Sequence, residues 1–342
     1  MTLPLMTPKR IAVTMGDPAG IGPEICLELL RSQQWKTADS PTVPIVFGDA
    51  GVLRRVATML GMTFDAPMIS IADWPTRCGQ LAEPCVLDLG YIDSDSVTPG
   101  RVDARCGDAA YRYVIAAIDA GLAGEVDAVS TGPLNKEAMH AAGHCYPGHT
   151  EIFAERMKAD RSCMMLTSAE LTCAFVTTHV GYHEVPALLN VARILDVIEL
   201  AAGAMRRICQ REPRLIACGL NPHAGENGLF GNREEERVII PALEVARTKG
   251  ILIEGPLPPD TAFLPWRRKS TDAFICMYHD QGHIPLKALA FDSAINTTLG
   301  LPVIRTSVDH GTAFDIAWQG KANSNSLFEA VALAAHLAGG RP

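Results

Sequence analysis

Hydrophobic positions along the chain fall into two alternating arrangements. Short continuous apolar runs, typical of buried strands, are separated by longer segments in which apolar residues recur every three or four positions, as on one face of a helix. The expected strands are residues 10–14, 43–47, 86–89, 128–130, 215–220, 251–254 and 273–278, and the expected helices are residues 23–30, 51–60, 108–123, 135–142, 191–208, 234–247 and 326–337. This alternation predicts an α/β protein with a mostly parallel sheet flanked by helices.

The chain lacks a stretch that reads as an interdomain linker. Its pieces rich in proline and glycine are short and lie between the expected elements, and no internal repeat or low-complexity segment is present. We therefore expect residues 8–340 to form a single unit without a clean linker, within which the exact boundaries of any subdomains are not defined by the sequence.

The amino-acid composition indicates which partners and which cellular compartment to expect. A net charge of −8 provides no broad basic face, which argues against nucleic acid as a partner. The ten cysteines contain no CxxC pair, and several lie in apolar runs, as is typical of a reducing compartment. No apolar stretch is long enough to span a bilayer, and the first ten residues lack the core of a secretion signal. The expectation is a cytoplasmic protein without a membrane partner.

Three apolar, strand-like runs each end in a histidine, at His179, His223 and His279. Ligands of α/β sheets collect outside the carboxyl ends of strands, and three imidazoles there could hold a catalytic metal with open coordination positions. Imidazole ligands suit zinc or another divalent transition metal better than calcium. A single histidine at a strand end is most often only a polar tip, so both interpretations stay open until the three are seen together.

A helix start after Pro147-Gly148 is a candidate anion site. Thr150 is suited to cap the helix, with the acidic Glu151 in its first turn. One interpretation is an ordinary helix cap. The other is that His149 and Thr150 present hydrogen-bond donors to an anion, whose charge the helix dipole favours.

A second anion-binding candidate comprises Lys287, Asn296 and Arg305. Arg305 lies in a run that reads as a strand, and a cation in apolar company usually has an anionic partner. That partner is either a local carboxylate, Asp309 or Asp315, or a phosphate or carboxylate ligand held by the three side chains.

The glycine-rich segment at residues 16–22 does not identify a nucleotide site. Its glycine spacing differs from GxGxxG, Pro18 lies inside it, and no Walker lysine follows. A tight turn between a strand and a helix accounts for it, and the residues that contact a cofactor remain unknown.

Five segments together carry a resemblance to a known family. They are residues 13–24, 147–151, 220–226, 277–282 and 300–313, and they span almost the whole chain. The chain resembles the 4-hydroxythreonine-4-phosphate dehydrogenase (PdxA) family. Residues 226–231, 283–287 and 313–322 are most similar to its branch acting on 4-phospho-threonate and 4-phospho-erythronate.

The resemblance implies an NAD- or NADP-linked, metal-dependent oxidation, with decarboxylation, of a 3-hydroxy acid 4-phosphate. It assigns His179, His223 and His279 to the metal, which is zinc or alternatively magnesium, cobalt or manganese. The substrate contacts it carries over are His149, Thr150, Lys287, Asn296 and Arg305. Asp260 and Lys287 become the catalytic candidates, Asp260 as a base or as support for the site.

The resemblance also implies architecture. The family has a two-lobed fold of interleaved α/β subdomains, like isocitrate and isopropylmalate dehydrogenases, with the active site in the cleft between the lobes. It implies a homodimer whose interface forms part of that site. The substrate is either the vitamin B6 intermediate 4-phosphohydroxy-L-threonine or a phosphorylated four-carbon sugar acid.

Three other functions compete with this interpretation. One is the dihydrodiol dehydrogenase of the same family, whose substrate has no phosphate; the presence of His149, Thr150 and Arg305 argues against it. The others are a metal-dependent phosphohydrolase and a non-catalytic metabolite sensor on the same scaffold.

Overall fold

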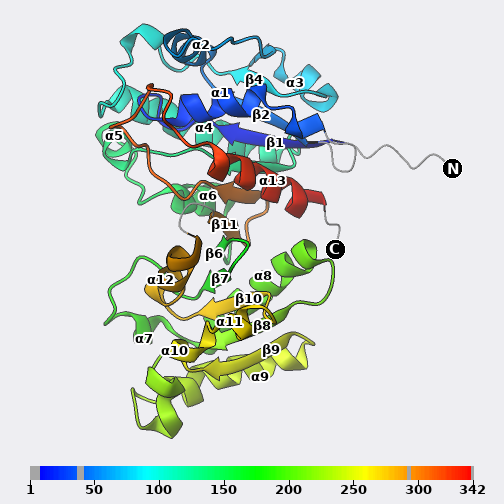
Figure 1. The fold of residues 1–342 in the computed structure, drawn as a ribbon, viewed down its shortest axis with the longest axis vertical. Helices are drawn as coiled ribbons and strands as arrows, with labels where there is room; N and C mark the ends of the chain where they lie inside the picture. The colour runs from blue at the N-terminus through cyan, green and yellow to red at the C-terminus, as the bar shows by residue number, and fades with distance from the viewer. Residues whose placement is uncertain (1–7, 37–41, 291–293, 340–342) are drawn as a thin grey trace, which may run out of the picture. The chain divides into compact units, whose positions relative to one another are not determined.

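The computed structural model describes residues 8–36, 42–290 and 294–339. The chain divides into two compact units, which we describe separately (Figure 1). Unit 1 contains Met1–Ala159 and Leu301–Gly339, and unit 2 contains Asp160–Gly300. Within the described residues, no helix has both the length and the apolar character needed to cross a membrane.

Unit 1 is built on a parallel sheet. Its strands lie in the order β3 (Met68–Ser70), β4 (Cys85–Asp88), β2 (Thr42–Gly48), β1 (Lys9–Thr14), β5 (Ala128–Thr131) and β12 (Ile304–Ser307), and each neighbouring pair is parallel. Every residue of β2 and β5 is buried. Helices cover both faces of such a sheet, which is why these strands are continuous apolar runs in the sequence.

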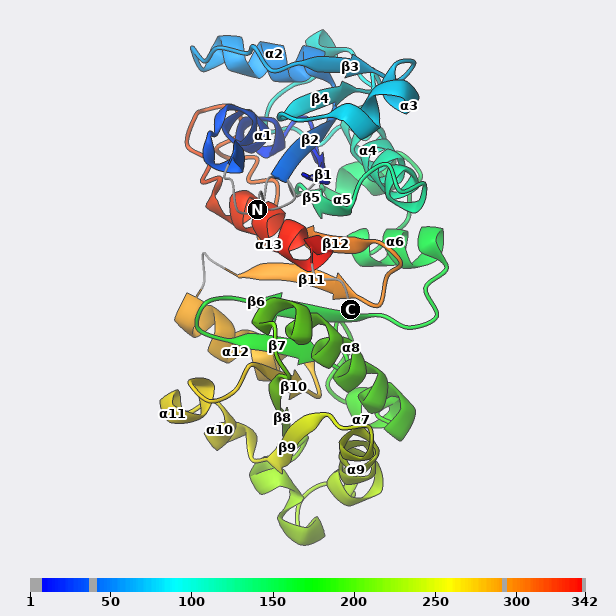
Figure 2. The same cartoon turned by 90° about the vertical axis from the view of Figure 1, so that its right-hand side faces the viewer.

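The helices of unit 1 are α1 (Gly22–Arg31), α2 (Ala50–Met59), α3 (Trp74–Arg77), α4 (Ala104–Leu122), α5 (Lys136–Ala141), α6 (His149–Met157) and α13 (Asn325–Gly339), with 3-10 turns at Gln34–Lys36, Cys78–Gln80 and Ser94–Ser96. Figure 2 shows α1 and α13 on one side of these strands and α4 on the other. Both α4 and α13 pack directly on β1 and β5. The two faces of the sheet are therefore covered, as the apolar runs predicted.

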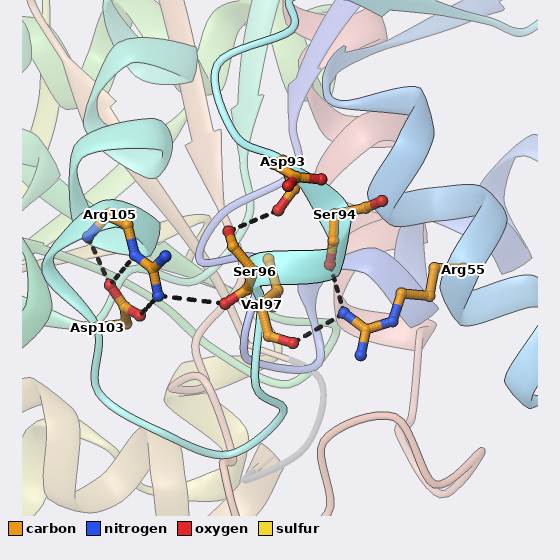
Figure 3. A network of polar contacts seen from close by, with 7 residues as sticks. All are labelled: Arg55, Asp93, Ser94, Ser96, Val97, Asp103 and Arg105. Atoms are coloured by element: carbon orange, nitrogen blue, oxygen red, sulfur yellow. Dashed lines mark hydrogen bonds and ion pairs between the residues drawn. The ribbon is translucent and has the colours of Figure 1, made fainter.

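A polar network fixes the segment that leads from β4 into α4 (Figure 3). Arg55 on α2 donates to the carbonyl of Ser94 and, over 2.8 Å, to that of Val97. Arg105 pairs with Asp103 at 2.6 Å and also reaches the carbonyl of Ser96. The segment is thus tied to α2 and α4 through its backbone oxygens.

Unit 2 contains a mixed sheet. Its strands lie in the order β11 (Ile295–Leu299), β6 (Cys163–Thr167), β7 (Thr172–Phe175), β10 (Ala273–Cys276), β8 (Arg214–Cys218) and β9 (Leu252–Leu257). β6 is antiparallel to both of its neighbours, and the remaining pairs are parallel. The helices are α7 (Val185–Leu188), α8 (Val191–Cys209), α9 (Ile240–Thr248), α10 (Pro259–Ala262), α11 (Pro265–Arg268) and α12 (His279–Ala290), with a 3-10 turn at Pro222–Gly228 and a π-helical turn at Glu235–Ile239.

The predicted fold class is confirmed: the chain is α/β, with mostly parallel strands and flanking helices. The likeness to isocitrate and isopropylmalate dehydrogenases and the single-unit boundaries at 8–340 stay predictions. The antiparallel strand β6 and the helix α12 were not expected. α12 contains Pro285 and begins at His279, so the strand expected at 273–278 ends earlier, at Cys276.

A buried carboxyl in unit 1 leads to a prediction about pH. Asp17, in the turn after β1, is 0% exposed, and its Oδ1 accepts from the amide of Ala19 over 2.9 Å. Burial raises the pKa of Asp17 from 3.8 to about 7, and the charge of Asp103 adds to the rise. The folded protein therefore holds this proton at pH values where the unfolded chain has released it.

Asp17 should consequently make the free energy of unfolding fall as pH rises from about 4 to about 7. In Asp17→Asn this contribution disappears, so the decline between about pH 5 and about pH 8 should be smaller by roughly 2–3 kcal/mol. Urea unfolding of both proteins at the two pH values measures the difference. Parallel pH dependences in wild type and variant would show that Asp17 has an ordinary pKa.

Candidate active site

Two of the three predicted metal ligands lie together in unit 2. His179 follows β7, His279 begins α12, and the centroids of their rings are 5.6 Å apart. Imidazole nitrogens bind zinc at about 2.0–2.1 Å, which places the centroids of two rings on one tetrahedral ion roughly 5–6 Å apart. The observed separation therefore suits a single divalent ion between His179 and His279.

Carboxylates orient two of the predicted ligands. Nδ1 of His279 lies 2.6 Å from Oδ1 of Asp280, and Nδ1 of His223 lies 3.0 Å from Oε2 of Glu226. A carboxylate that accepts from Nδ1–H leaves the Nε2 lone pair to bind a metal, the arrangement common around metal-binding histidines. The hydrogen bond from Tyr182 and then that from His279 lower the pKa of Asp280, which keeps it a carboxylate.

His223 lies in an unusual turn. The backbone of all five residues from 223 to 227 has positive φ, between 42° and 79°. Each non-glycine residue in this conformation costs roughly 1–2 kcal/mol, so contacts from elsewhere must hold the turn. Oε1 of Glu235 accepts from the amides of Leu220 and Asn221, over 2.9 and 2.8 Å, immediately before it. Strain retained in this way is typical of functional sites.

The described part of one chain does not gather all three predicted metal ligands into one group. Across residues 8–36, 42–290 and 294–339, no three histidine, cysteine, aspartate or glutamate side chains form a group that could hold a metal ion. The structure thus brings His179 and His279 together but does not place His223 with them in one such group. The hydrogen bond with Glu226 is the main cause of the raised pKa of His223, and the charge of Asp260, on α10, adds to the rise.

Unit 1 contains the predicted buried cation. Arg305, on β12, is 2% exposed, and its Nη2 donates to Oγ1 of Thr131 over 3.0 Å. Its Nη1 donates to Oγ1 of Thr150 over 3.4 Å, which joins two residues predicted to share an anion. Burial lowers the pKa of Arg305 to about 10, so the guanidinium is still protonated at neutral pH. The prediction of a strand that carries a buried cation is confirmed.

His149 is the first residue of α6, beside Arg305. Burial, and next the charge of Arg305, lower the pKa of His149 well below its usual range, so its imidazole is neutral. Among the described residues, the buried Nε2 of His149 has no hydrogen-bond partner. A guanidinium, a threonine hydroxyl and a neutral imidazole at a helix N-terminus form a donor set suited to phosphate.

Lys287 and Asn296 lie in unit 2. Lys287 is on α12, where His279, His283 and Lys287 follow one another at four-residue spacing and so share a face of the helix. The ring of His283 stacks on that of His279 with centroids 3.6 Å apart. Asn296 is on β11, and its buried Oδ1 has no hydrogen-bond partner within the described part of the chain. Lys287 is therefore on the same helix face as a metal candidate.

The residues that support the candidate ligands were not predicted from the sequence; they are Asp280, Glu226, Tyr182 and Glu235. Asp280 and Glu226 follow their histidines by one and three positions, a spacing that could have indicated carboxylate support. Tyr182 and Glu235 have no comparable signal, because their contacts depend on how separate segments pack.

Comparison with known proteins places the chain in a family. The family described as "Pyridoxal phosphate biosynthetic protein PdxA" matches residues 40–334. The chain belongs to the PdxA family. The predicted resemblance is thereby confirmed, and it extends over most of the sequence.

Members of the PdxA family similar to this chain have dehydrogenase names. D-threonate 4-phosphate dehydrogenase of Salmonella typhimurium is 43% identical, covering 97% of this chain and 100% of the relative. 4-Hydroxythreonine-4-phosphate dehydrogenase of Trichlorobacter lovleyi is 41% identical, covering 98% and 99%. A crystal structure of 4-hydroxythreonine-4-phosphate dehydrogenase from Klebsiella pneumoniae has a TM-score of 0.82 and 45% identity, covering 96% and 99%. By its family, the chain is an oxidoreductase.

Proposed function

We propose that this PdxA-family chain oxidises a phosphorylated hydroxy acid with NAD or NADP and a divalent metal ion. The observation that carries the proposal is the pair His179 and His279, at a separation suited to one ion, with Asp280 on Nδ1 of His279. The phosphate-type donor set of His149, Thr150 and Arg305 supports a phosphorylated substrate. The relatives are named as dehydrogenases of a hydroxy acid 4-phosphate, which agrees with an oxidation reaction and with a phosphorylated substrate.

The proposed metal ligands are His179, His223 and His279, and the proposed metal is zinc, with magnesium, cobalt and manganese as alternatives. When bound, such an ion would act as a Lewis acid toward the substrate hydroxyl and the carbonyl formed from it. His279 would present Nε2 because Asp280 holds its Nδ1, and His223 would do so because of Glu226. The negative charges of Asp280 and Glu226 beside these imidazoles also favour binding of a cation.

The proposed reaction transfers a hydride and then releases carbon dioxide. A bound nicotinamide cofactor would accept the hydrogen of the substrate C–H bond together with its electron pair, and the hydroxyl proton would pass to a base. Asp260 and Lys287 are the proposed acid–base groups, and Lys287 shares a helix face with His279. The 3-keto acid then loses its carboxylate as carbon dioxide, and the carbon left behind takes up a proton. Arg305, Thr150 and His149 would hold the phosphate, with Lys287 and Asn296 as further substrate contacts.

We further propose a homodimer in which a second copy of the chain completes the metal centre. The support is that the described part of one chain brings two, not three, of the predicted imidazoles into one group. The cytoplasm is the proposed location, where NAD and phosphorylated acids are available.

An assay with a panel of acids tests the proposal. The purified protein, supplied with NAD and a divalent metal, is given 4-phosphohydroxy-L-threonine, 4-phospho-D-threonate, 4-phospho-D-erythronate and the terephthalate dihydrodiol. We expect NADH from at least one phosphorylated acid and little from the dihydrodiol. Release of phosphate without NADH would instead indicate a phosphohydrolase, and equal turnover of all four would contradict selection of phosphate by Arg305.

A further inference from the structure

The buried side chain of Gln281 joins two segments of unit 2, each of which carries a predicted metal ligand. Gln281 is the third residue of α12, two positions after His279, and is 6% exposed. Its Oε1 accepts from the amide of Met277 over 2.7 Å, and its Nε2 donates to the carbonyl of Gly219 over 2.7 Å. Gly219 lies between β8 and His223, so one side-chain amide bridges the ends of two strands.

The first of these bonds alone would be an ordinary helix cap. A glutamate or a glutamine in the third position of a helix often accepts from a backbone amide near the helix start. The bond to Gly219 is different, because a carboxylate can only accept, whereas the amide of glutamine donates through its nitrogen. Its partner is also 62 positions away along the chain, outside the helix. This second bond therefore has no part in capping and depends on the amide.

Gly219 in turn holds the left-handed turn that carries His223. A Cβ atom on Gly219 would lie 2.8 Å from Cα of Ala224, so the turn packs directly against the backbone of Gly219. The amide of Gly219 donates to a carbonyl of β9 over 2.8 Å, and Glu235 accepts from the next two amides. A shift of Gly219 would consequently move Ala224 and, with it, the adjacent His223.

The segment of the third predicted ligand is tied to the same point. The carbonyl of Met277 accepts from the amide and from the hydroxyl of Thr177, over 3.2 and 2.8 Å, two positions before His179. Met277 is 0% exposed, and its own amide is the group that donates to Gln281. Met277 therefore connects the segment of His179 to Gln281, and Gln281 connects both to Gly219.

We propose that Gln281 is a positioning residue of the metal centre, which sets the segment of His223 relative to the segments of His179 and His279. The inference rests on the proposed function, in which Gln281 has no role. A zinc ion binds imidazole nitrogens at about 2.0–2.1 Å, so displacement of one ligand segment weakens binding of the ion. Gln281 acts through the backbone of Gly219, because both ends of its amide are already bonded.

Gln281→Met tests the inference, since methionine has a similar length and lacks the amide donor. In the metal-free full-length protein, hydrogen exchange of residues 219–227 should be roughly 5- to 100-fold faster than in wild type, because the carbonyl of Gly219 loses its buried partner. The Kd for zinc and for cobalt should rise roughly 10- to 100-fold, as is usual when support around a metal ligand is removed. The absorption spectrum of the cobalt-loaded protein, which reports coordination geometry, should also change.

Gln281→Asn is a second variant, since asparagine keeps an amide that is one methylene too short to reach both partners, and it should change the same quantities in the same direction. Gln210→Met is the matched control. Gln210 is an exposed glutamine of unit 2 whose Nε2 donates to the carbonyl of Arg207 over 2.6 Å, at the end of α8. This control should retain the wild-type exchange of residues 219–227, the Kd for both metals and the cobalt spectrum.

Unchanged exchange of residues 219–227 in both Gln281 variants would overturn the inference. Faster exchange confined to residues 277–283 would show that Gln281 only caps the helix and would also overturn it, as would a wild-type Kd and cobalt spectrum in both variants. If Gln281→Met does not fold, the same measurements on Gln281→Asn decide. A wild-type protein that binds neither zinc nor cobalt refutes the proposed metal centre, whereas a wild type that binds them, with unaffected variants, refutes only the role of Gln281.

Discussion

Replacing His279 with alanine should remove the bound metal and lower kcat by roughly a thousandfold or more. A thousandfold loss corresponds to about 4 kcal/mol of transition-state stabilisation, within the several kcal/mol that a Lewis-acid metal supplies. His279 is partly exposed at the start of α12 and is not part of a hydrophobic core, so the fold should remain. Metal analysis, circular dichroism and steady-state rates on the same preparation measure the three quantities.

His183→Ala is the matched control. His183 is an exposed histidine in the segment between β7 and α7, four positions from His179. It should keep both metal and rate. If His279→Ala retains its metal and its rate, or if both substitutions have the same effect, the assignment of His279 as a ligand is wrong.

The second large effect is expected from Arg305→Met, which keeps much of the side-chain length and removes the charge. The value of kcat/KM for the phosphorylated acid should fall roughly 10²- to 10³-fold, since truncating one side of a buried charge pair costs about 2–5 kcal/mol. The kcat/KM of Arg305→Lys should lie between those of wild type and Arg305→Met, because lysine keeps the charge and loses the two-pronged guanidinium. Initial rates over a range of acid concentrations provide the measurement.

Arg156→Met is the control for this series. Arg156 is also in unit 1, on α6, but it is exposed and pairs with Asp119 over 2.8 Å. Its loss should leave kcat/KM unchanged. A phosphorylated acid that is turned over equally well by wild type and Arg305→Met would show that Arg305 pairs with a protein group and does not bind the substrate phosphate.

The parts of the fold that the sequence predicted are those determined by local pattern. The parallel strands of unit 1 are covered by helices on both faces and so are continuous apolar runs, and α4 and α8 have one regular apolar stripe. Arg305 could be placed on a strand for a similar reason, because the apolar Val303 and Ile304 directly precede it.

What the sequence did not predict depends on contacts between distant segments. The apolar run of β6 does not indicate its direction, which is decided by pairing with β11 and β7. Glu235 reaches the amides just before the left-handed turn at His223 only through packing, and Pro285 conceals the helical pattern of α12. Likewise, each histidine could be identified from the sequence as a candidate ligand. Only the fold shows that the ring centroids of His179 and His279 are 5.6 Å apart.

A catalytic metal ion at these histidines is tested most directly by the rate of NADH formation from one phosphorylated hydroxy acid. The rate is measured on the same protein before metal removal, after rigorous chelation and dialysis, and after a divalent metal is restored. We expect the rate to be lost on chelation and to return with zinc, cobalt, manganese or magnesium. A protein that keeps its full rate after the metal content has been shown to be negligible would contradict the claim that His179, His223 and His279 hold a catalytic ion.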